Sequence, residues 1–231
     1  MYAKFFKRLL DFVLSFTALI VLSPILLILT VVGAIAMKGN PFFLQPRPGM
    51  KGKDGKEKIF KLIKFRTMSN AKDKNGNLLP DAQRLGKYGA WLRSSSLDEL
   101  PSLANIALAH ISIVGPRPFL IRDLVFMTDD QRRRHNVRPG LTGLAQVNGR
   151  NNITWEQKFE YDLLYIDQGI TFMGDLKIIL QTVGKVLKRS DTVREGTVSD
   201  MDYGDWLVME GKVTKEEYEQ KQTEAKELLG V

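Results

Sequence analysis

The sequence predicts a mainly helical α+β protein that is monotopic in the membrane, with an N-terminal re-entrant helix and a compact cytoplasmic domain. Three patterns support this prediction: an uncharged apolar stretch at 12–37 with a Ser-Pro pair inside it, strand-like alternation at 57–68, and two apolar stripes of helical period within 154–188. We divide the chain into a membrane helix at 1–38, a cytoplasmic domain at 39–195 and a charged helical tail at 196–231.

Ser23 and Pro24 lie in the middle of the apolar stretch. Proline removes a helical hydrogen bond and clashes with the preceding turn, so we expect the helix to break there. The stretch exceeds the roughly 20 residues that cross a bilayer. Both flanks are basic, however, so the positive-inside rule assigns no direction to a crossing. A helix that dips into the membrane and returns keeps both flanks in the cytoplasm; a true crossing and a buried soluble hairpin are the alternatives.

The composition limits the classes of partner and of metal site. The 231 residues carry a formal net charge of +8 and a pI of about 9.6, which favours phosphates, nucleic acid or acidic lipid as partners. The chain has no cysteine and only two histidines. Disulfides and thiolate metal sites are therefore excluded, and a histidine-rich zinc site is not expected.

The segment before residue 93 reads as two strands, a loop and a helix. Residues 41–45 form a strand candidate, and the Arg-Pro-Gly run at 47–52 has turn chemistry. Alternation at 57–68 predicts a second strand, which carries Lys64 and Arg66 on one face. These two cations either bind phosphate or are solvated strand charges. A polar loop at 69–80 and a single helix at 81–92 follow.

An adjacent carboxylate pair, Asp98 and Glu99, is the first candidate for chemistry. One carboxylate can attack a phosphorus atom while its neighbour holds Mg²⁺ on the same diphosphate. The structural alternative is a capping box, because Ser96-Leu-Asp-Glu has the S-x-x-E form in which the glutamate only satisfies the backbone of Ser96. The pattern alone leaves both interpretations open.

An arginine precedes the pair and another follows it. Arg93 stands before it, and Arg117 lies in a Pro-Arg-Pro turn that restricts the backbone on both sides. A guanidinium held in this way suits bidentate phosphate binding, and a plain turn is the alternative. Carboxylates beside such cations indicate a metal-phosphate site.

The rest of the chain is predicted to be mostly helical. The charged segment at 128–136, with its three consecutive arginines, is expected to be a helix whose surface is solvated or faces lipid headgroups. The glycine-rich run at 138–150 permits close backbone approach to a ligand and ends at Arg150. Helices are predicted at 154–166, 171–188 and 212–229, with a linker at 189–203. The stripe of the 171–188 helix either packs on the core or lies in the membrane interface.

The chain resembles the bacterial sugar transferase family, the small monotopic phosphoglycosyl transferases. The resemblance rests on an ordered set of motifs within residues 2–190: KFFKRLLDF, the Ser-Pro break, PFFLQPRPG, FKLIKFRTM, RSSSLDELP, SIVGPRP, RPGLTGLAQVNGR and DLKIIL. Two positions depart from the family pattern, Ser102 after the dyad's Leu-Pro and the run at 109–112 before Val-Gly-Pro-Arg-Pro. The departures leave the dyad and the arginines intact.

The resemblance implies transfer of a sugar-1-phosphate from a UDP-sugar to polyprenyl (undecaprenyl) phosphate with release of UMP, at the cytoplasmic face of a bacterial cell membrane. It implies that Asp98 is the nucleophile and that Glu99 binds Mg²⁺. By the same resemblance Arg93, Arg117 and Arg150 bind the substrate phosphates. A homodimer is one option for the oligomeric state, and nucleic acid is not an expected partner.

Two other functions are carried as alternatives. A membrane-tethered, non-enzymatic adaptor with a basic surface for anionic lipid or nucleic acid would explain the charge and the anchor, but not a carboxylate pair between positioned arginines. An ordinary glycosyltransferase would release UDP in place of UMP. The sequence identifies neither the sugar nor the glycan pathway.

Overall fold

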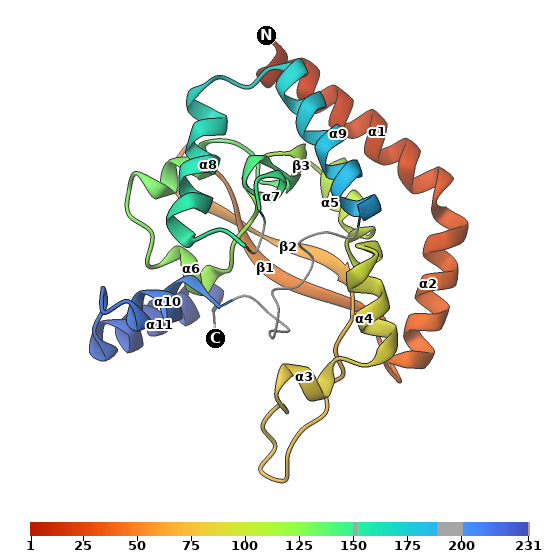
Figure 1. Cartoon of the computed structure of the whole chain (residues 1–231), viewed down its shortest axis with the longest axis vertical. Helices are drawn as coiled ribbons and strands as arrows, with labels where there is room; N and C mark the ends of the chain where they lie inside the picture. Colours follow the sequence, from red (N-terminus) through yellow and green to blue (C-terminus); the bar gives the residue numbers. More distant parts are fainter. Residues whose placement is uncertain (150–151, 189–200, 231) are drawn as a thin grey trace.

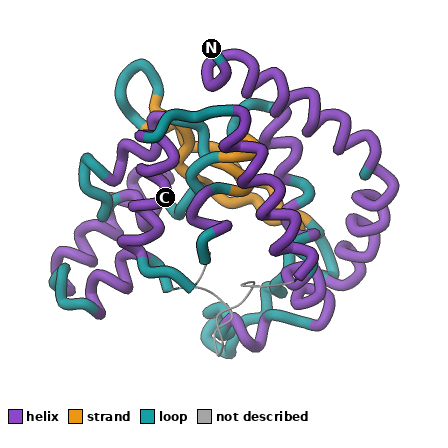
Figure 2. The backbone as a smooth tube through the Cα atoms, turned by 45° about the horizontal axis from the view of Figure 1, so that its top comes forward, coloured by secondary structure: helices purple, strands orange, loops and turns teal. Residues whose placement is uncertain are grey.

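A central β-hairpin has helices on either side of it (Figures 1 and 2). The computed structural model describes residues 1–149, 152–188 and 201–230, and within them the protein is a mainly helical α+β fold, as predicted. In Figure 1 the N-terminal helices α1 and α2 form one side of the molecule and the C-terminal helices α10 and α11 lie on the opposite side.

The described helices and strands follow one another along the chain in the order given next. They are η1 (Tyr2–Phe6), α1 (Lys7–Val21), α2 (Ser23–Ala36), β1 (Phe42–Lys51), β2 (Glu57–Phe65), α3 (Asp81–Arg84), α4 (Lys87–Ser94), η2 (Leu97–Glu99), α5 (Ser102–Ala107), β3 (Ser112–Val114), α6 (Ile121–Leu124), η3 (Gln131–Asn136), β4 (Gly140–Thr142), α7 (Leu144–Val147), α8 (Trp155–Asp167), α9 (Phe172–Lys188), α10 (Tyr203–Met209) and α11 (Lys215–Leu229).

The central hairpin pairs β1 with β2 in antiparallel register, with Phe42 opposite Phe65 and Arg47 opposite Phe60. The strand predicted at 57–68 is confirmed. The turn predicted at 47–52 is wrong, because β1 continues through Arg47 and Pro48 to Lys51, with an irregularity in the register after Pro48. Pro46 and Pro48 are accommodated in this two-stranded ribbon because each strand has a free edge.

A short parallel pair, β3 and β4, brings the glycine-rich run against the Pro-Arg-Pro turn. Ser112 pairs with Gly140 and Val114 with Thr142. A Cβ atom on Gly140 would lie 2.1 Å from the backbone nitrogen of Gly115, and one on Gly143 would lie 2.2 Å from its carbonyl oxygen. These glycines therefore permit close approach of two chain segments, whereas the sequence suggested close approach to a ligand.

The N-terminal helices are bent where the sequence places its Ser-Pro pair. Leu22 separates α1 from α2, Ser23 and Pro24 lie in the first turn of α2, and the hydroxyl of Ser23 donates to the carbonyl of Ile20 at 2.7 Å. Taken singly, no helix among the described residues has the length and apolarity to cross a bilayer. Residues 2–21 and 23–36 meet those criteria only as a pair, bent by 64°.

Polar contacts attach α1 to the domain while its apolar side chains stay exposed. Asp11 is buried, and its carboxylate accepts from the Ser112 hydroxyl at 2.7 Å and from the Ile113 backbone N–H at 3.0 Å. Arg8 donates to two carbonyls at the end of α5. Exposed apolar residues on these helices include Leu9, Phe12, Val13, Phe16, Ile20, Leu27, Ile28, Val31 and Ile35.

Two predicted helices differ from the observed elements. The helix predicted at 81–92 is two helices, α3 and α4, because Leu85 adopts an extended backbone conformation and Gly86 begins the second helix. Within the segment at 128–136, Gln131–Asn136 form the 3₁₀ helix η3, and the segment is not uniformly solvated. The Arg133 side chain is 42% exposed, but Arg134 and His135 are buried.

Helices α8, α9 and α11 confirm the predictions at 154–166, 171–188 and 212–229. The predicted stripe of α9 is divided: Ile179 is partly buried against the cluster that contains Val114 and Tyr165, while Leu180 and Val183 are exposed. Helix α10 was not predicted. The predicted linker at 189–203 and the predicted domain boundary near 195 lie largely outside the described residues.

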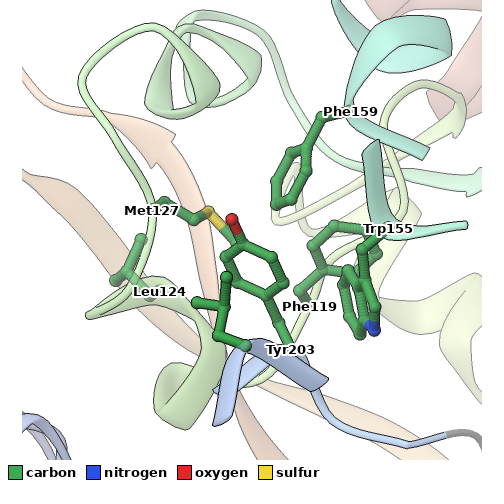
Figure 3. Close-up of a cluster of buried hydrophobic side chains, with 7 residues drawn as sticks. Phe119, Leu124, Met127, Trp155, Phe159 and Tyr203 are labelled. Carbon is green, nitrogen blue, oxygen red and sulfur yellow. The ribbon is translucent and has the colours of Figure 1, made fainter. Parts of the chain in front are cut away.

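The C-terminal segment contributes to the largest buried cluster (Figure 3). Tyr203 and Leu207 of α10 pack with residues of four earlier segments, among them Phe119, Trp155 and Phe159. Because burial of large side chains stabilises a fold by about 1.5–3 kcal/mol each, α10 is an integral part of the folded chain.

Candidate functional site

Asp98 and Glu99 lie on η2, a single 3₁₀ turn between α4 and α5. Ser96 directly before it has a left-handed backbone with φ of 56°, a conformation that costs a non-glycine residue about 1–3 kcal/mol. The capping box is not formed: the N–H of Ser96 donates to the carbonyl of Arg93, and Glu99 contacts other partners. This strained turn sets the direction in which the two carboxylates leave the chain.

Glu99 joins the strand β2 to the Pro-Arg-Pro turn. Its Oε1 accepts from Lys64 Nζ at 2.8 Å and from Arg117 NH2 at 2.7 Å. The Glu99 charge raises the pKa of Arg117, while burial lowers the pKa of Lys64. Two of the cations assigned to phosphate therefore contact the dyad directly, and they hold the Glu99 side chain in place.

Asp98 has a different electrostatic environment from its neighbour. Burial raises the pKa of its carboxyl above the ordinary range, and the negative charge of Glu99 adds to the effect. Lys64, Arg117 and Arg93 act in the opposite direction. A carboxylate with a raised pKa is more basic than an exposed aspartate, and cations nearby keep it available in the ionised form.

Buried guanidinium groups hold the Pro-Arg-Pro turn at 116–118. Arg134 NH2 donates to the carbonyl of Arg117 at 2.5 Å, and Arg47 NH1 donates to the carbonyl of Pro118 at 2.8 Å. Arg134 is itself paired with Asp162 through two hydrogen bonds of 3.0 and 2.6 Å. The side chain of Arg117 is therefore presented from a backbone that is fixed from two sides.

A polar cavity of about 310 Å³ is lined by three arginines, one of which, Arg117, contacts Glu99 of the dyad. Arg93, whose Nε donates to the Thr67 hydroxyl at 3.1 Å, lines it together with Arg117 and Arg47. Burial and the nearby Arg117 lower the pKa of Arg47 to about 10. The cavity is completed by Pro118, Phe119, Leu120, Asp123, Ala145, Gln146, Trp155, Lys158, Asp162, Met201 and Asp202.

Sequence reasoning missed Arg47 and Lys158 as lining residues. A signal for Arg47 was present: the Pro-Arg-Pro triplet at 46–48 repeats the one around Arg117. No comparable local signal marks Lys158, which reaches the cavity only through the packing of α8.

An apolar cavity of about 250 Å³ lies beside the polar one. The two cavities share Arg117 and Gln146 as lining residues. Glu99 lines the apolar cavity but not the polar one. Its other lining residues come from η2, α5, β3, β4, α7 and α9 and include Leu100, Leu103, Ile113, Leu141, Val147, Ile179, Val183 and Val186. The site thus joins a cationic cavity to an apolar one at a carboxylate-arginine contact.

Two predicted phosphate ligands are not placed in the site. Arg66 follows the last residue of β2 and is not among the described residues that line these cavities. Arg150 lies outside the described residues. Their phosphate roles remain predictions.

The dyad suits Mg²⁺ bound with substrate better than a metal held by protein alone. Within the ranges 1–149, 152–188 and 201–230, no three His, Cys, Asp or Glu side chains converge as a metal site. Mg²⁺ is commonly held by one or two carboxylates, several waters and substrate phosphates. Asp98 and Glu99, with Arg117 of the arginine-lined cavity in contact with Glu99, match that donor set.

Comparison with known proteins places these features in context. The family model described as bacterial sugar transferase matches residues 2–189. A Bacillus subtilis protein named as the uncharacterized sugar transferase EpsL is 48% identical over 181 residues, which are 78% of this chain and 87% of that protein.

Relatives with more specific names are longer than this chain. A UDP-glucose:undecaprenyl-phosphate glucose-1-phosphate transferase of Klebsiella pneumoniae is 42% identical over 193 residues, covering 78% of this chain and 40% of that protein. An undecaprenyl-phosphate galactose phosphotransferase of Salmonella typhimurium is 31% identical over 205 residues, covering 81% and 41%. The chain spans less than half the length of these two relatives.

Proposed function

Because the chain belongs to the bacterial sugar transferase family, we propose that it transfers a sugar-1-phosphate from a UDP-sugar to polyprenyl phosphate, with undecaprenyl phosphate as the carrier, and releases UMP. In this proposal it is a transferase for substituted phosphate groups that starts a surface polysaccharide or glycoconjugate. The observation that carries the proposal is the contact of Glu99, the neighbour of Asp98, with Arg117 at the junction of an arginine-lined cavity and an apolar one.

In the first step a carboxylate oxygen of Asp98 attacks the phosphorus atom that bears the sugar. The bond from that phosphorus to the UMP oxygen breaks, UMP leaves with the electron pair, and an aspartyl phosphosugar remains on the enzyme. The raised pKa of Asp98 is consistent with a more nucleophilic carboxylate. Arg117 and Arg93 would bind the phosphate oxygens that gain charge.

In the second step an oxygen of polyprenyl phosphate attacks the same phosphorus atom. The acyl-phosphate bond breaks, the carboxylate of Asp98 is regenerated, and the product is a polyprenyl diphosphate sugar. The apolar cavity has room for the first part of an isoprenoid chain, and its contact with Glu99 and Arg117 would bring the acceptor phosphate to the reacting centre.

Glu99 would hold Mg²⁺ together with phosphate oxygens of the donor. When bound, the ion supplies neutralisation of the charge that develops on the departing UMP. Lys64 and Arg117, which contact Glu99 Oε1, keep this carboxylate oriented.

A location at the cytoplasmic face of the membrane is part of the proposal. Exposed apolar side chains are concentrated on α1, α2 and α9, and contiguous patches of this kind mark membrane or protein contacts. The 64° bend between α1 and α2 favours a re-entrant helix over a straight crossing. An apolar acceptor and a water-soluble donor would then meet at the interface.

Nucleotide release tests the reaction class. The purified protein in nanodiscs receives Mg²⁺, polyprenyl phosphate and a panel of UDP-sugars, and the nucleotide product is identified. We expect UMP from at least one donor. UDP would establish an ordinary glycosyltransferase, and no release with salt-dependent binding to anionic lipid or nucleic acid would favour the non-enzymatic adaptor.

Asp98→Asn tests the nucleophile. The amide cannot form the acyl phosphate, so we expect turnover to fall to background while membrane binding, measured by vesicle flotation, stays at the wild-type level. UMP release at the wild-type rate in this variant would contradict the assignment.

A further inference from the structure

We infer that Met201 and Asp202, which lie beyond the family match, complete the donor cavity, with Asp202 accepting hydrogen bonds from hydroxyl groups of the bound sugar nucleotide. The matched region ends at residue 189, and Met201 and Asp202 line the polar cavity that also holds Arg47, Arg93 and Arg117. The inference rests on the proposed function and adds a residue for recognition of the donor.

Residues 201–203 are firmly attached next to the cavity. Tyr203 is only 5% exposed, and its ring lies among Phe119, Trp155 and Phe159 (Figure 3). The backbone N–H of Tyr203 donates to Asp123 Oδ1 at 2.9 Å, and the indole N–H of Trp155 donates to the carbonyl of Met201 at 3.2 Å. Asp202 is therefore presented from a backbone anchored on both sides.

The side chain of Asp202 is not used to cap its own helix. Asp202 is the N-terminal cap residue of α10, yet it makes no side-chain capping bond, which an aspartate at this position commonly does. Its Oδ2 is 2.9 Å from Arg122 NH2. Asp205, one turn further along α10, contacts the same arginine at 3.1 Å but does not line the cavity.

Other polar groups of the cavity require partners that the described residues do not provide. Gln146 is 9% exposed, and neither its amide nitrogen nor its amide oxygen has a hydrogen-bond partner within the described parts of the chain. Asp162 is 1% exposed, and its Oδ1 atom likewise has no hydrogen-bond partner among the described residues. Buried polar groups are nearly always hydrogen-bonded, so these atoms indicate a ligand rich in donors and acceptors.

The charges of the lining residues indicate which part of the ligand each region of the cavity would bind. The three arginines suit the diphosphate, whereas a carboxylate beside a phosphate would be repelled. Asp202 should therefore face an uncharged, hydroxylated part of the donor. Asp123 supports this environment: burial and the neighbouring Asp202 raise its pKa to about 6, so a second carboxyl group lies close by. Hydroxyls of the ribose and of the transferred sugar share the required chemistry.

The test compares Asp202→Ala with Asp205→Ala, a matched variant that removes the other carboxylate on Arg122. Dissociation constants are measured by calorimetry for UMP and for the UDP-sugar that the wild-type protein turns over. We expect Asp202→Ala to weaken UDP-sugar binding about tenfold and Asp205→Ala to leave it unchanged. A loss confined to UDP-sugar assigns the contact to the transferred sugar; an equal loss with UMP assigns it to the ribose.

Wild-type affinity in Asp202→Ala overturns the inference, as does an equal loss in Asp205→Ala, which would mean that both carboxylates only anchor α10. Thermal unfolding of the two variants separates anchoring from recognition. The proposed function fails separately, when the wild-type protein releases no UMP from any donor; UMP release with unaltered binding in Asp202→Ala removes only the present inference.

Discussion

Replacing Asp162 with asparagine should destabilise the protein by about 3–5 kcal/mol, because it leaves the Arg134 guanidinium buried without a counter-charge. Both side chains are 1% exposed, and one carboxylate oxygen accepts both hydrogen bonds from Arg134. Burial lowers the pKa of Arg134 and raises the pKa of Asp162, which reflects the cost of removing both charges from water. The ring of Phe119, 3.7 Å from the guanidinium, offsets only part of that cost.

For a chain of this length each kcal/mol shifts the melting temperature by about 2–4 °C, so the expected decrease is roughly 6–20 °C. Thermal unfolding of the full chain in detergent, followed by circular dichroism, measures it. Donor affinity should fall as well, because Arg134 holds the carbonyl of Arg117.

Asp167→Asn is the matched control. Asp167 pairs with the exposed Arg133, and loss of an exposed pair costs at most about 1 kcal/mol. A melting temperature of Asp162→Asn within about 2 °C of the wild type would refute the reasoning that this pair is an essential buried contact.

Three further predictions concern the dyad and the apolar cavity. The acid limb of single-turnover UMP release should lie above the pH of about 4 expected for an ordinary aspartate, because the pKa of Asp98 is raised and only its ionised form attacks. Lys64→Gln removes a cation that favours that ionised form, so the limb should move to higher pH; a limb that moves down or not at all contradicts this. Val183→Trp should fill part of the apolar cavity and raise the KM for polyprenyl phosphate roughly tenfold. Leu180 is exposed on the same helix outside the cavity, so Leu180→Trp should leave this KM unchanged. Equal effects of the two substitutions would contradict the assignment of the apolar cavity to the acceptor. Ser96→Val should lower the free energy of unfolding by about 1–3 kcal/mol and slow UMP release, because a β-branched residue tolerates the left-handed backbone poorly. Ser96→Gly should have a melting temperature no lower than that of the wild type. A melting temperature of Ser96→Val equal to that of Ser96→Gly would show that the turn is not strained.

Local patterns account for what the sequence predicted correctly. Strand β2 and helices α8 and α9 follow from period-2 and period-3.6 repeats, and the bend at Leu22 coincides with the Ser-Pro pair. The errors occur where local rules compete with packing. The Arg-Pro-Gly run at 47–52 is typical of a turn, but β1 continues through it to Lys51, and the helix at 81–92 is divided at Leu85 and Gly86.

The sequence by itself determined the class of fold, the family resemblance and the presence of a carboxylate pair near positioned arginines, since each depends on residues that are neighbours in the chain. Tertiary structure alone decided which charged side chains are buried and which of them contact the same partner. Arg134 stands in a run of three arginines that predicts a solvated surface, yet Asp162, 28 positions away, makes its burial tolerable. In the same way Lys64 and Arg117 meet on one oxygen of Glu99, and Asp202 reaches the polar cavity only because Tyr203 packs in a core built from distant segments. Such contacts depend on long-range packing and on removal of water, which no local period records.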